Sequence, residues 1–283
     1  MILILKMGGM TVPKYIKNEL KGFGIKDAEA LPLSMCRVVR PYKLERCGFY
    51  DLESLSVLIF AIPYYTAHKE KNISSYAIPR DYHLFCRELF DTIIPRLTAK
   101  YPDNKFVGFA DNSPIDERDA AAIAGLGIIG KNGMLITEKY SSYVFLAEII
   151  TDLPLKYSEK HEIAYCKDCG ICASACPKGE LGECLSAITQ KKGELTEAEK
   201  EAIKKHGSAW GCDICSEVCP HTKKAIENNT IYTDIPFFLS NLTPTLTSGD
   251  VEGMSDEEFS SRAYSWRKKE TILRNLSIIE DKT

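Results

Sequence analysis

Eight cysteines lie close together in one stretch of this chain. The sequence holds 11 cysteines, and eight of them fall between residues 166 and 219. Closely spaced cysteines form disulfides in small secreted proteins and bind metals or iron-sulfur clusters in proteins of the reducing cytosol. The apolar start of the chain, residues 1–6, is too short for a signal peptide, so metal ligation is the preferred interpretation.

The spacing of these cysteines predicts two iron-sulfur clusters. Residues 166–177 read CKDCGICASACP, in which three cysteines bind one [4Fe-4S] cluster and the one before proline binds another. Residues 212–220 read CDICSEVCP and lack a middle cysteine, which Cys184 can replace. Zinc is the alternative, although it usually takes two separated pairs. The predicted ligand sets are Cys166, Cys169, Cys172 and Cys219 for one cluster, and Cys176, Cys184, Cys212 and Cys215 for the other.

The remaining cysteines and a neighbouring histidine have simpler interpretations. Cys36, Cys47 and Cys86 stand apart from the cluster segment, and isolated cysteines commonly pack as small apolar residues. His221 follows the second Cys-Pro pair, and eight thiolates already account for two clusters. We expect three core cysteines and a surface histidine.

Two features of the first half could also do chemistry. Asp111 follows the apolar run 106–110, and residues at strand ends often carry function; a helix cap or turn is the alternative. Residues 125–130 read GLGIIG, which matches a dinucleotide-binding fingerprint. That fingerprint follows a strand and opens a helix, however, and this segment has the reverse context. The glycines are better explained by a loop where backbone approaches something closely, beside Lys131 and Asn132.

The surrounding pattern predicts a layered α/β domain. Apolar runs at residues 57–62, 106–110, 134–137 and 143–147 predict strands. Apolar spacing of three and four predicts helices at residues 82–97, bent or ended at Pro95, and 116–124, stopped by Gly125. The charged segment 191–206 predicts a solvated helix, and Ser255 with Glu258 predicts a helix start.

Composition limits the remaining choices. The chain has 283 residues, 45% of them hydrophobic and 27% charged, which is typical of a folded globular protein. No stretch approaches the roughly 20 apolar residues of a membrane helix, so we predict a cytoplasmic protein without a membrane partner. Its net charge of -3 provides no global positive field for nucleic acid.

The chain resembles the epoxyqueuosine reductase family, cobalamin-dependent iron-sulfur enzymes of queuosine-tRNA synthesis that are related to reductive dehalogenases. The resemblance is carried by residues 111–155, DNSPIDERDAAAIAGLGIIGKNGMLITEKYSSYVFLAEIITDLPL, followed by the cysteine motifs and residues 183–190. It implies an α/β (α+β) fold: a nitroreductase-like cobalamin-binding domain at residues 1–160, a ferredoxin-like two-cluster domain at 161–225, and a C-terminal helical segment at 226–283 that packs on the core.

The resemblance also implies a reaction and its residues. Electrons from a low-potential donor, such as ferredoxin or flavodoxin, would pass through the clusters to cobalamin. Asp111 matches the family's proton donor, which protonates the departing epoxide oxygen. The substrate would be tRNA carrying epoxyqueuosine, and the protein a monomer. Positions that match cofactor contacts in the family are Asp111, Lys131, Leu135, Leu146, Ser186, Cys212 and Asp213; Arg80, Asp81 and His83 are further candidates for the pocket, or an ordinary helix start.

A basic segment with aromatic residues is the local signal for tRNA. Basic side chains can hold phosphate and aromatic rings can stack on bases, although a solvated helix is the simpler interpretation. Two other functions stay open: reduction of a small molecule by the same cofactors, and electron transfer by a two-cluster protein without cobalamin. The residues of this segment are Arg262, Tyr264, Trp266, Arg267, Lys268, Lys269 and Arg274.

Overall fold

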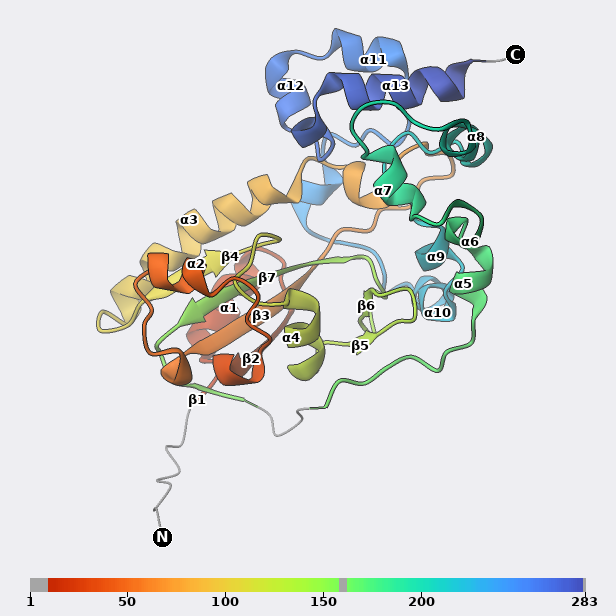
Figure 1. The fold of residues 1–283 in the computed structure, drawn as a ribbon. Helices are drawn as coiled ribbons and strands as arrows, with labels where there is room; N and C mark the ends of the chain where they lie inside the picture. The colour runs from red at the N-terminus through yellow and green to blue at the C-terminus, as the bar shows by residue number, and fades with distance from the viewer. Residues whose placement is uncertain (1–9, 158–161, 282–283) are drawn as a thin grey trace. The chain divides into compact units, whose positions relative to one another are not determined.

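The computed structural model describes residues 10–157 and 162–281, which form two compact units with a mixed α/β fold (Figure 1). Unit 1 consists of Met1–Ile62, Cys86–Thr137 and Val144–Lys167. Unit 2 consists of Pro63–Phe85, Glu138–Tyr143 and Asp168–Thr283.

This division differs from the three consecutive segments expected from the sequence. Two stretches of the first half fold with the cysteine-rich segment, because Ile73 pairs with Trp210 and the Ser141 hydroxyl lies 2.7 Å from that of Thr222. The C-terminal helices also belong to unit 2. The cobalamin-binding and ferredoxin-like roles of these segments stay predictions.

A four-stranded sheet in the order β2-β3-β7-β4 is the framework of unit 1. Strands β2 and β3 are antiparallel, as are β4 and β7. Every residue of β3 is buried, as expected for a central strand covered on both faces. The strands are β2 (Asp27–Pro32), β3 (Ser56–Pro63), β4 (Phe106–Phe109) and β7 (Val144–Thr151); two-residue strands β1 (Met10–Thr11) and β8 (Leu155–Lys156) pair in parallel, and β5 (Ile128–Ile129) pairs with β6 (Leu135–Ile136).

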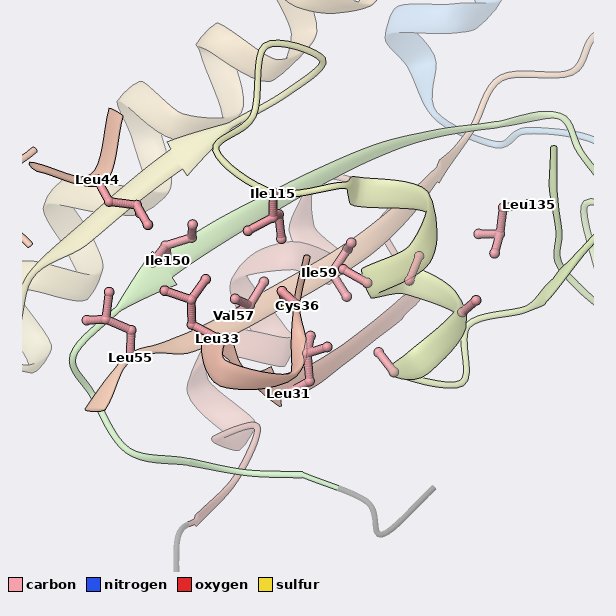
Figure 2. Close-up of a cluster of buried hydrophobic side chains, with 14 of the residues drawn as sticks. Leu31, Leu33, Cys36, Leu44, Leu55, Val57, Ile59, Ile115, Leu135 and Ile150 are labelled. Carbon is pink, nitrogen blue, oxygen red and sulfur yellow. The ribbon is translucent and has the colours of Figure 1, made fainter. Parts of the chain in front are cut away.

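Helices cover both faces of this sheet. The buried cluster of Figure 2 lies between α4 and the strands and includes Val57 of β3 and Ile150 of β7. Val107 of β4 packs on the same cluster, whereas a Cβ on Gly108, the next residue, would meet the Phe90 ring of α3 at 2.4 Å. Successive residues of a strand face opposite sides, so α3 packs on the other face. The helices are α1 (Lys14–Gly22), α2 (Pro41–Arg46), α3 (Tyr82–Lys100) and α4 (Glu117–Ile123).

Unit 2 is helical around two buried clusters. One surrounds Trp210 and Tyr264, whose rings meet edge to face, and the other surrounds Ile188 and Ile203. Helix α13 packs against α7, α8 and α11. The helices are α5 (Ile171–Ala175), α6 (Lys178–Leu181), α7 (Leu185–Thr189), α8 (Glu197–His206), α9 (Ile214–Glu217), α10 (Pro220–Glu227), α11 (Ser248–Gly253), α12 (Asp256–Ser260) and α13 (Lys269–Glu280).

The predicted elements are present with different boundaries. Pro95 lies inside α3, which continues to Lys100. Helix α8 begins only at Glu197, because Thr196 and Glu199 form a capping box there. The predicted strand at 143–147 extends to Thr151, and the one at 134–137 is reduced to two residues. No helix among the described residues is long and apolar enough to cross a bilayer.

Candidate iron-sulfur and active site

The cysteine-rich segment of unit 2 is built from short helices separated by tight turns. Helix α5, which carries Cys172, packs against α9, which carries Cys215. Cys219 is the N-cap of α10, and Pro220 takes the first helical position, where proline is favoured. Cys176 ends α5 in an extended conformation before Pro177. At both motifs the Cys-Pro pair therefore lies where one short helix ends and the next begins.

Three of the predicted ligands of one cluster interact in unit 2. Burial is the main cause that raises the pKa of the Cys212 thiol to about 11, and the nearby Cys215 and Cys184 contribute to the same rise. Such thiols hold their protons until a cation replaces them. Cys212 also lines a cavity of about 160 Å³, together with Lys71, Asp213 and Glu217.

Backbone N–H groups point at two of the cysteine sulfurs. The amide of Lys178 donates to Cys176 Sγ at 3.4 Å, and in unit 1 the amide of Lys131 donates to Cys166 Sγ at 3.3 Å. Hydrogen bonds of this kind stabilise thiolate and tune cluster potentials. In the described part of the chain, no three Cys, His, Asp or Glu side chains converge on a position for a single metal ion. A cubane spaces its four ligands more widely than one ion does.

The three other cysteines lie where core residues are expected. Cys36 and Cys86 are buried, and Cys47 is half-buried against the unit 1 cluster. Burial raises the pKa of Cys36 to about 12, so its thiol stays neutral. The side chain of His221 is exposed at the start of α10, as predicted.

Asp111 occupies a turn of unusual geometry directly after β4. Its φ of 60° lies in the left-handed region, which few residues other than glycine adopt. The amide of Asn112 donates to Ala110 O at 2.7 Å, closing a three-residue γ-turn around Asp111. Asp116, not Asp111, caps α4. Asp111 is therefore an exposed carboxylic acid on a strained turn, a combination that clusters at functional sites.

Sequence inspection missed the side chains behind this turn. Glu117 accepts the Asp111 amide at 3.2 Å, and the Ser113 hydroxyl donates to Glu148 Oε1. Glu148 is fully buried in β7. A charged residue within the otherwise apolar run of β7 was the available signal.

The glycine-rich loop is a tight hairpin rather than a dinucleotide-binding turn. It follows α4 and leads into β5 and β6, as its sequence context predicted. A Cβ on Gly127 would lie 2.5 Å from Ile136 O, so only glycine fits. The loop also carries Ile129, whose carbonyl accepts the Cys166 amide at 3.0 Å. It thus approaches the backbone of the first cysteine.

Some of the predicted cofactor-contact side chains are accessible, and others are packed in the core or bound by hydrogen bonds. Lys131 is exposed, and Ser186 lines a cavity of about 690 Å³ with Cys184. Leu135 is buried in the unit 1 cluster, and Leu146 packs against it. The Asp213 carboxylate receives hydrogen bonds from Lys71 Nζ, the hydroxyls of Ser74 and Ser75 and the Ser75 amide.

The other candidates have structural partners in unit 2. Asp81 accepts the His83 amide at 2.9 Å and His83 Nδ1 lies 2.8 Å from it, as at an ordinary helix start. The Arg80 guanidinium lies 4.2 Å from the centre of the Phe237 ring.

Much of the basic segment serves the fold. Tyr264 is completely buried and cannot stack on a base, which corrects that part of the prediction. Arg262 donates to Asn241 O, Arg274 to Lys191 O and Lys269 to Met254 O. Trp266 is 57% exposed, with the Arg267 guanidinium 3.8 Å from its ring centre. Arg267 is half-buried and Lys268 is exposed, so Trp266, Arg267 and Lys268 are the part that suits nucleic acid.

Comparison with known proteins gives a consistent result. The family described as epoxyqueuosine reductase QueG, DUF1730, matches residues 52–112. The epoxyqueuosine reductase of Gloeobacter violaceus is 36% identical over 220 residues, 72% of this chain and 68% of that protein. That of Listeria monocytogenes is 32% identical over 255 residues, 82% of this chain and 66% of that protein.

Solved structures show the same fold. An epoxyqueuosine reductase crystallised with an epoxyqueuosine-modified tRNA stem loop superposes with a TM-score of 0.73. It shares 24% identity, and the alignment covers 94% of this chain and 80% of that one. This agreement shows a shared fold, and the sequence identity shows that the chain belongs to the epoxyqueuosine reductase family of oxidoreductases.

Proposed function

We propose that the protein reduces epoxyqueuosine to queuosine in tRNA, with two [4Fe-4S] clusters and cobalamin. The observation that carries this proposal is the Asp111 turn, which presents an exposed acid at a strand end in a chain of this family. A protein of the same fold has been solved with an epoxyqueuosine-modified stem loop. A low-potential carrier such as ferredoxin or flavodoxin would supply the electrons.

The cysteine-rich segment fits iron-sulfur clusters. Eight thiols are available, and the sulfurs of Cys166 and Cys176 accept hydrogen bonds from backbone N–H groups, as cluster-ligating sulfurs do. The ligand sets are those predicted from spacing, with Cys184 completing the set of Cys176, Cys212 and Cys215. Bacterial-type cysteine motifs of this kind bind cubane clusters that carry single electrons.

Several of the predicted cobalamin-contact side chains are accessible, and others are engaged within their own unit. Asp111, Lys131 and Ser186 are accessible at surfaces or cavities. Leu135 is packed in the core, and the Asp213 carboxylate is fully engaged. They would shape the backbone of the site rather than offer free groups. Bound cobalamin would supply a strongly nucleophilic metal for attack on the epoxide carbon.

Asp111 performs the proton chemistry in this proposal. A departing epoxide oxygen needs a proton donor within hydrogen-bond reach, and a positioned carboxylic acid contributes roughly 100-fold to 10,000-fold to such a step. The strained turn fixes the backbone of Asp111, so the acid is presented in one orientation. With two electrons from the carrier and two protons, one of them through Asp111, the epoxide oxygen would leave as water and the alkene of queuosine would form.

One observation favours a second substrate class. Tyr264 is buried and Arg262 and Arg274 bond to carbonyls of the fold, which leaves Trp266, Arg267 and Lys268 as a small surface for tRNA. Reduction of a small molecule by the same cofactors is therefore the alternative function.

The test is anaerobic reconstitution followed by titration with substrate. We expect about eight irons per chain from two four-iron clusters, binding of cobalamin seen in the visible spectrum, and consumption of the epoxide under a low-potential reductant. Cobalamin binding without turnover of the tRNA would favour the small-molecule alternative. Irons without cobalamin binding would favour an electron carrier.

A further inference from the structure

The carboxyl group of Glu148 is buried close to the Asp111 turn. Within the part of the chain that the structure describes, it has too few hydrogen-bond donors around it to stabilise a negative charge. Glu148 is fully buried in β7, and Ser113 donates to one of its oxygens. No donor among the described residues reaches the other oxygen, Oε2. A buried carboxylate with an unsatisfied oxygen is costly, so the group takes up a proton instead. Burial accordingly raises the pKa of Glu148 well above its usual range.

The proton on Glu148 has an acceptor in Glu117. Glu117 stands at the first position of α4, and its carboxyl group and that of Glu148 act on each other's pKa. Two carboxyls in contact cannot both be charged, so they share a proton. Burial raises the pKa of Glu117 to about 7, although a carboxylate is normally favoured at a helix start.

The same Glu117 carboxyl holds the turn that carries the acid. Its Oε1 accepts the Asp111 amide at 3.2 Å. On the other side of the turn, Arg40 donates to Ser113 O at 2.9 Å and Lys43 donates to Asn112 O at 2.6 Å. These cations bind the residues after Asp111, whereas Glu117 binds Asp111 itself. Each contact lies within unit 1.

We propose that Glu117 and Glu148 are positioning residues for Asp111, because a proton shared between their carboxyls orients Glu117 to accept the Asp111 amide and maintain the strained turn. This inference rests on the proposed function, in which Asp111 is the proton donor. Loss of the shared proton would place two charges together, separate the carboxyls and release the turn.

The other ionisable groups described around Glu117 and Glu148 do not supply a positive charge that would remove the need for the shared proton. Asp111 and Asp116 lie near Glu117, and both add negative charge that favours the shared proton. Asp116 is itself paired with Arg37. The Cys36 thiol lies near Glu148, and burial raises its pKa to about 12, so it stays neutral where the pair titrates.

Substitutions that mimic the shared proton test this proposal. In Glu148→Gln, the amide nitrogen can donate to Glu117 and the oxygen can accept from Ser113 at every pH. In Glu117→Gln, the oxygen can accept the Asp111 amide and the nitrogen can donate to Glu148. Glu117→Ala removes the contact, and Glu53→Gln, on an exposed acid of the same unit, is the matched control.

The first readout is hydrogen exchange of the peptide spanning residues 106–116, corrected for intrinsic rates. We expect protection of the wild-type Asp111 amide to fall about tenfold from pH 6 to pH 9, and to stay level in either glutamine variant. Glu117→Ala should lose the protection at every pH, and Glu53→Gln should behave like the wild type.

The second readout is turnover of epoxyqueuosine-containing tRNA by the reconstituted enzyme. Glu117→Ala should lower kcat about tenfold with little change in KM or iron content, and Glu117→Gln should restore it. Unchanged protection in Glu117→Ala, or wild-type pH dependence in both glutamine variants, would overturn the positioning role. Because exchange is measured without substrate, failure of the wild type to reduce the tRNA would overturn the proposed function separately.

Discussion

Glu117 Oε1 lies 3.2 Å from the backbone nitrogen of Asp111, so the first side chain of α4 holds the turn at the end of β4. Five residues lie between the two, and the turn between them folds back on the helix start. The bond ties a half-buried carboxyl to an exposed acid. The exposed turn is therefore held by a group within the fold.

This relationship makes the stability of unit 1 depend on pH. The pKa of Glu117 is raised to about 7 in the folded chain and lies near 4.3 when unfolded, so the folded state binds the proton more tightly. This contribution is present below about pH 4 and is lost as the pH rises through 7. We expect a loss of about 2–3 kcal/mol between roughly pH 5 and 8 in the wild type, and less in Glu117→Gln.

The slowest-exchanging amides of β3 and β7 report this free energy, because they exchange only through global opening. Glu53→Gln, on an exposed side chain, serves as the control and should follow the wild type. Equal pH dependence in the wild type and Glu117→Gln would contradict the assignment.

Replacement of Asp111 by asparagine should remove the proposed proton donor and keep the backbone conformation of the turn. Asparagine tolerates the left-handed backbone that Asp111 adopts at a φ of 60°, but it cannot donate the proton. We expect Asp111→Asn to lower kcat by roughly 100-fold to 10,000-fold with unchanged iron content and unfolding temperature. Asp103→Asn, on another exposed turn of unit 1, should leave kcat unchanged; near-normal turnover by Asp111→Asn would remove the acid role.

The exposed aromatic of the basic segment makes a separate prediction about the substrate. Trp266 is 57% exposed beside Arg267, whereas Tyr264 is buried. If this surface binds tRNA, Trp266→Ala should weaken binding by about 1–3 kcal/mol, the usual contribution of a stacked base. Binding titrations at several salt concentrations measure this loss, with Tyr232→Ala, another exposed aromatic of unit 2, as the control. Unaltered affinity would place the tRNA surface elsewhere.

Local patterns predicted much of the fold but not its division into units. The run at residues 57–62 became the buried strand β3, and the glycine after residues 116–124 ended α4. These features depend on neighbours in sequence. Ile73 pairs with Trp210, which is far away in the chain. No local sequence pattern could therefore predict that Pro63–Phe85 folds with the cysteine-rich segment of unit 2.

Candidate site residues could be chosen from the sequence where the residue type itself suggests a function. Cysteine spacing and the strand end before Asp111 were visible in the sequence. Glu148 was not identified, because the predicted strand stopped at residue 147, one position short of it. Tyr264 was wrongly predicted to be an exposed ring that stacks on a base. Its position among basic residues does not show whether the ring faces solvent or packs in the buried cluster around Trp210.

The glycine loop should tolerate no side chain at its narrowest point. A Cβ at position 127 would lie 2.5 Å from Ile136 O, and the hairpin backbone would have to move. We expect Gly127→Ala to destabilise unit 1 by about 1–3 kcal/mol, the usual cost of overpacking. Thermal unfolding measures the change. Gly22→Ala at the end of α1, where nothing lies within 4 Å, should be neutral or stabilising, and equal effects of both would contradict this account.

Cys184 is the least conventional of the proposed ligands, because it lies outside both cysteine motifs. It interacts with Cys212 in unit 2, beside the cavity lined by Ser186. A four-iron cluster that loses one thiolate ligand is commonly unstable or converted, so we expect Cys184→Ser to lose up to about four of eight irons. The half-buried Cys47 provides the control, and Cys47→Ser should keep the full content. Iron analysis and electron paramagnetic resonance of the reduced proteins make the comparison. A full complement of unaltered clusters in Cys184→Ser would assign the fourth ligand to another residue.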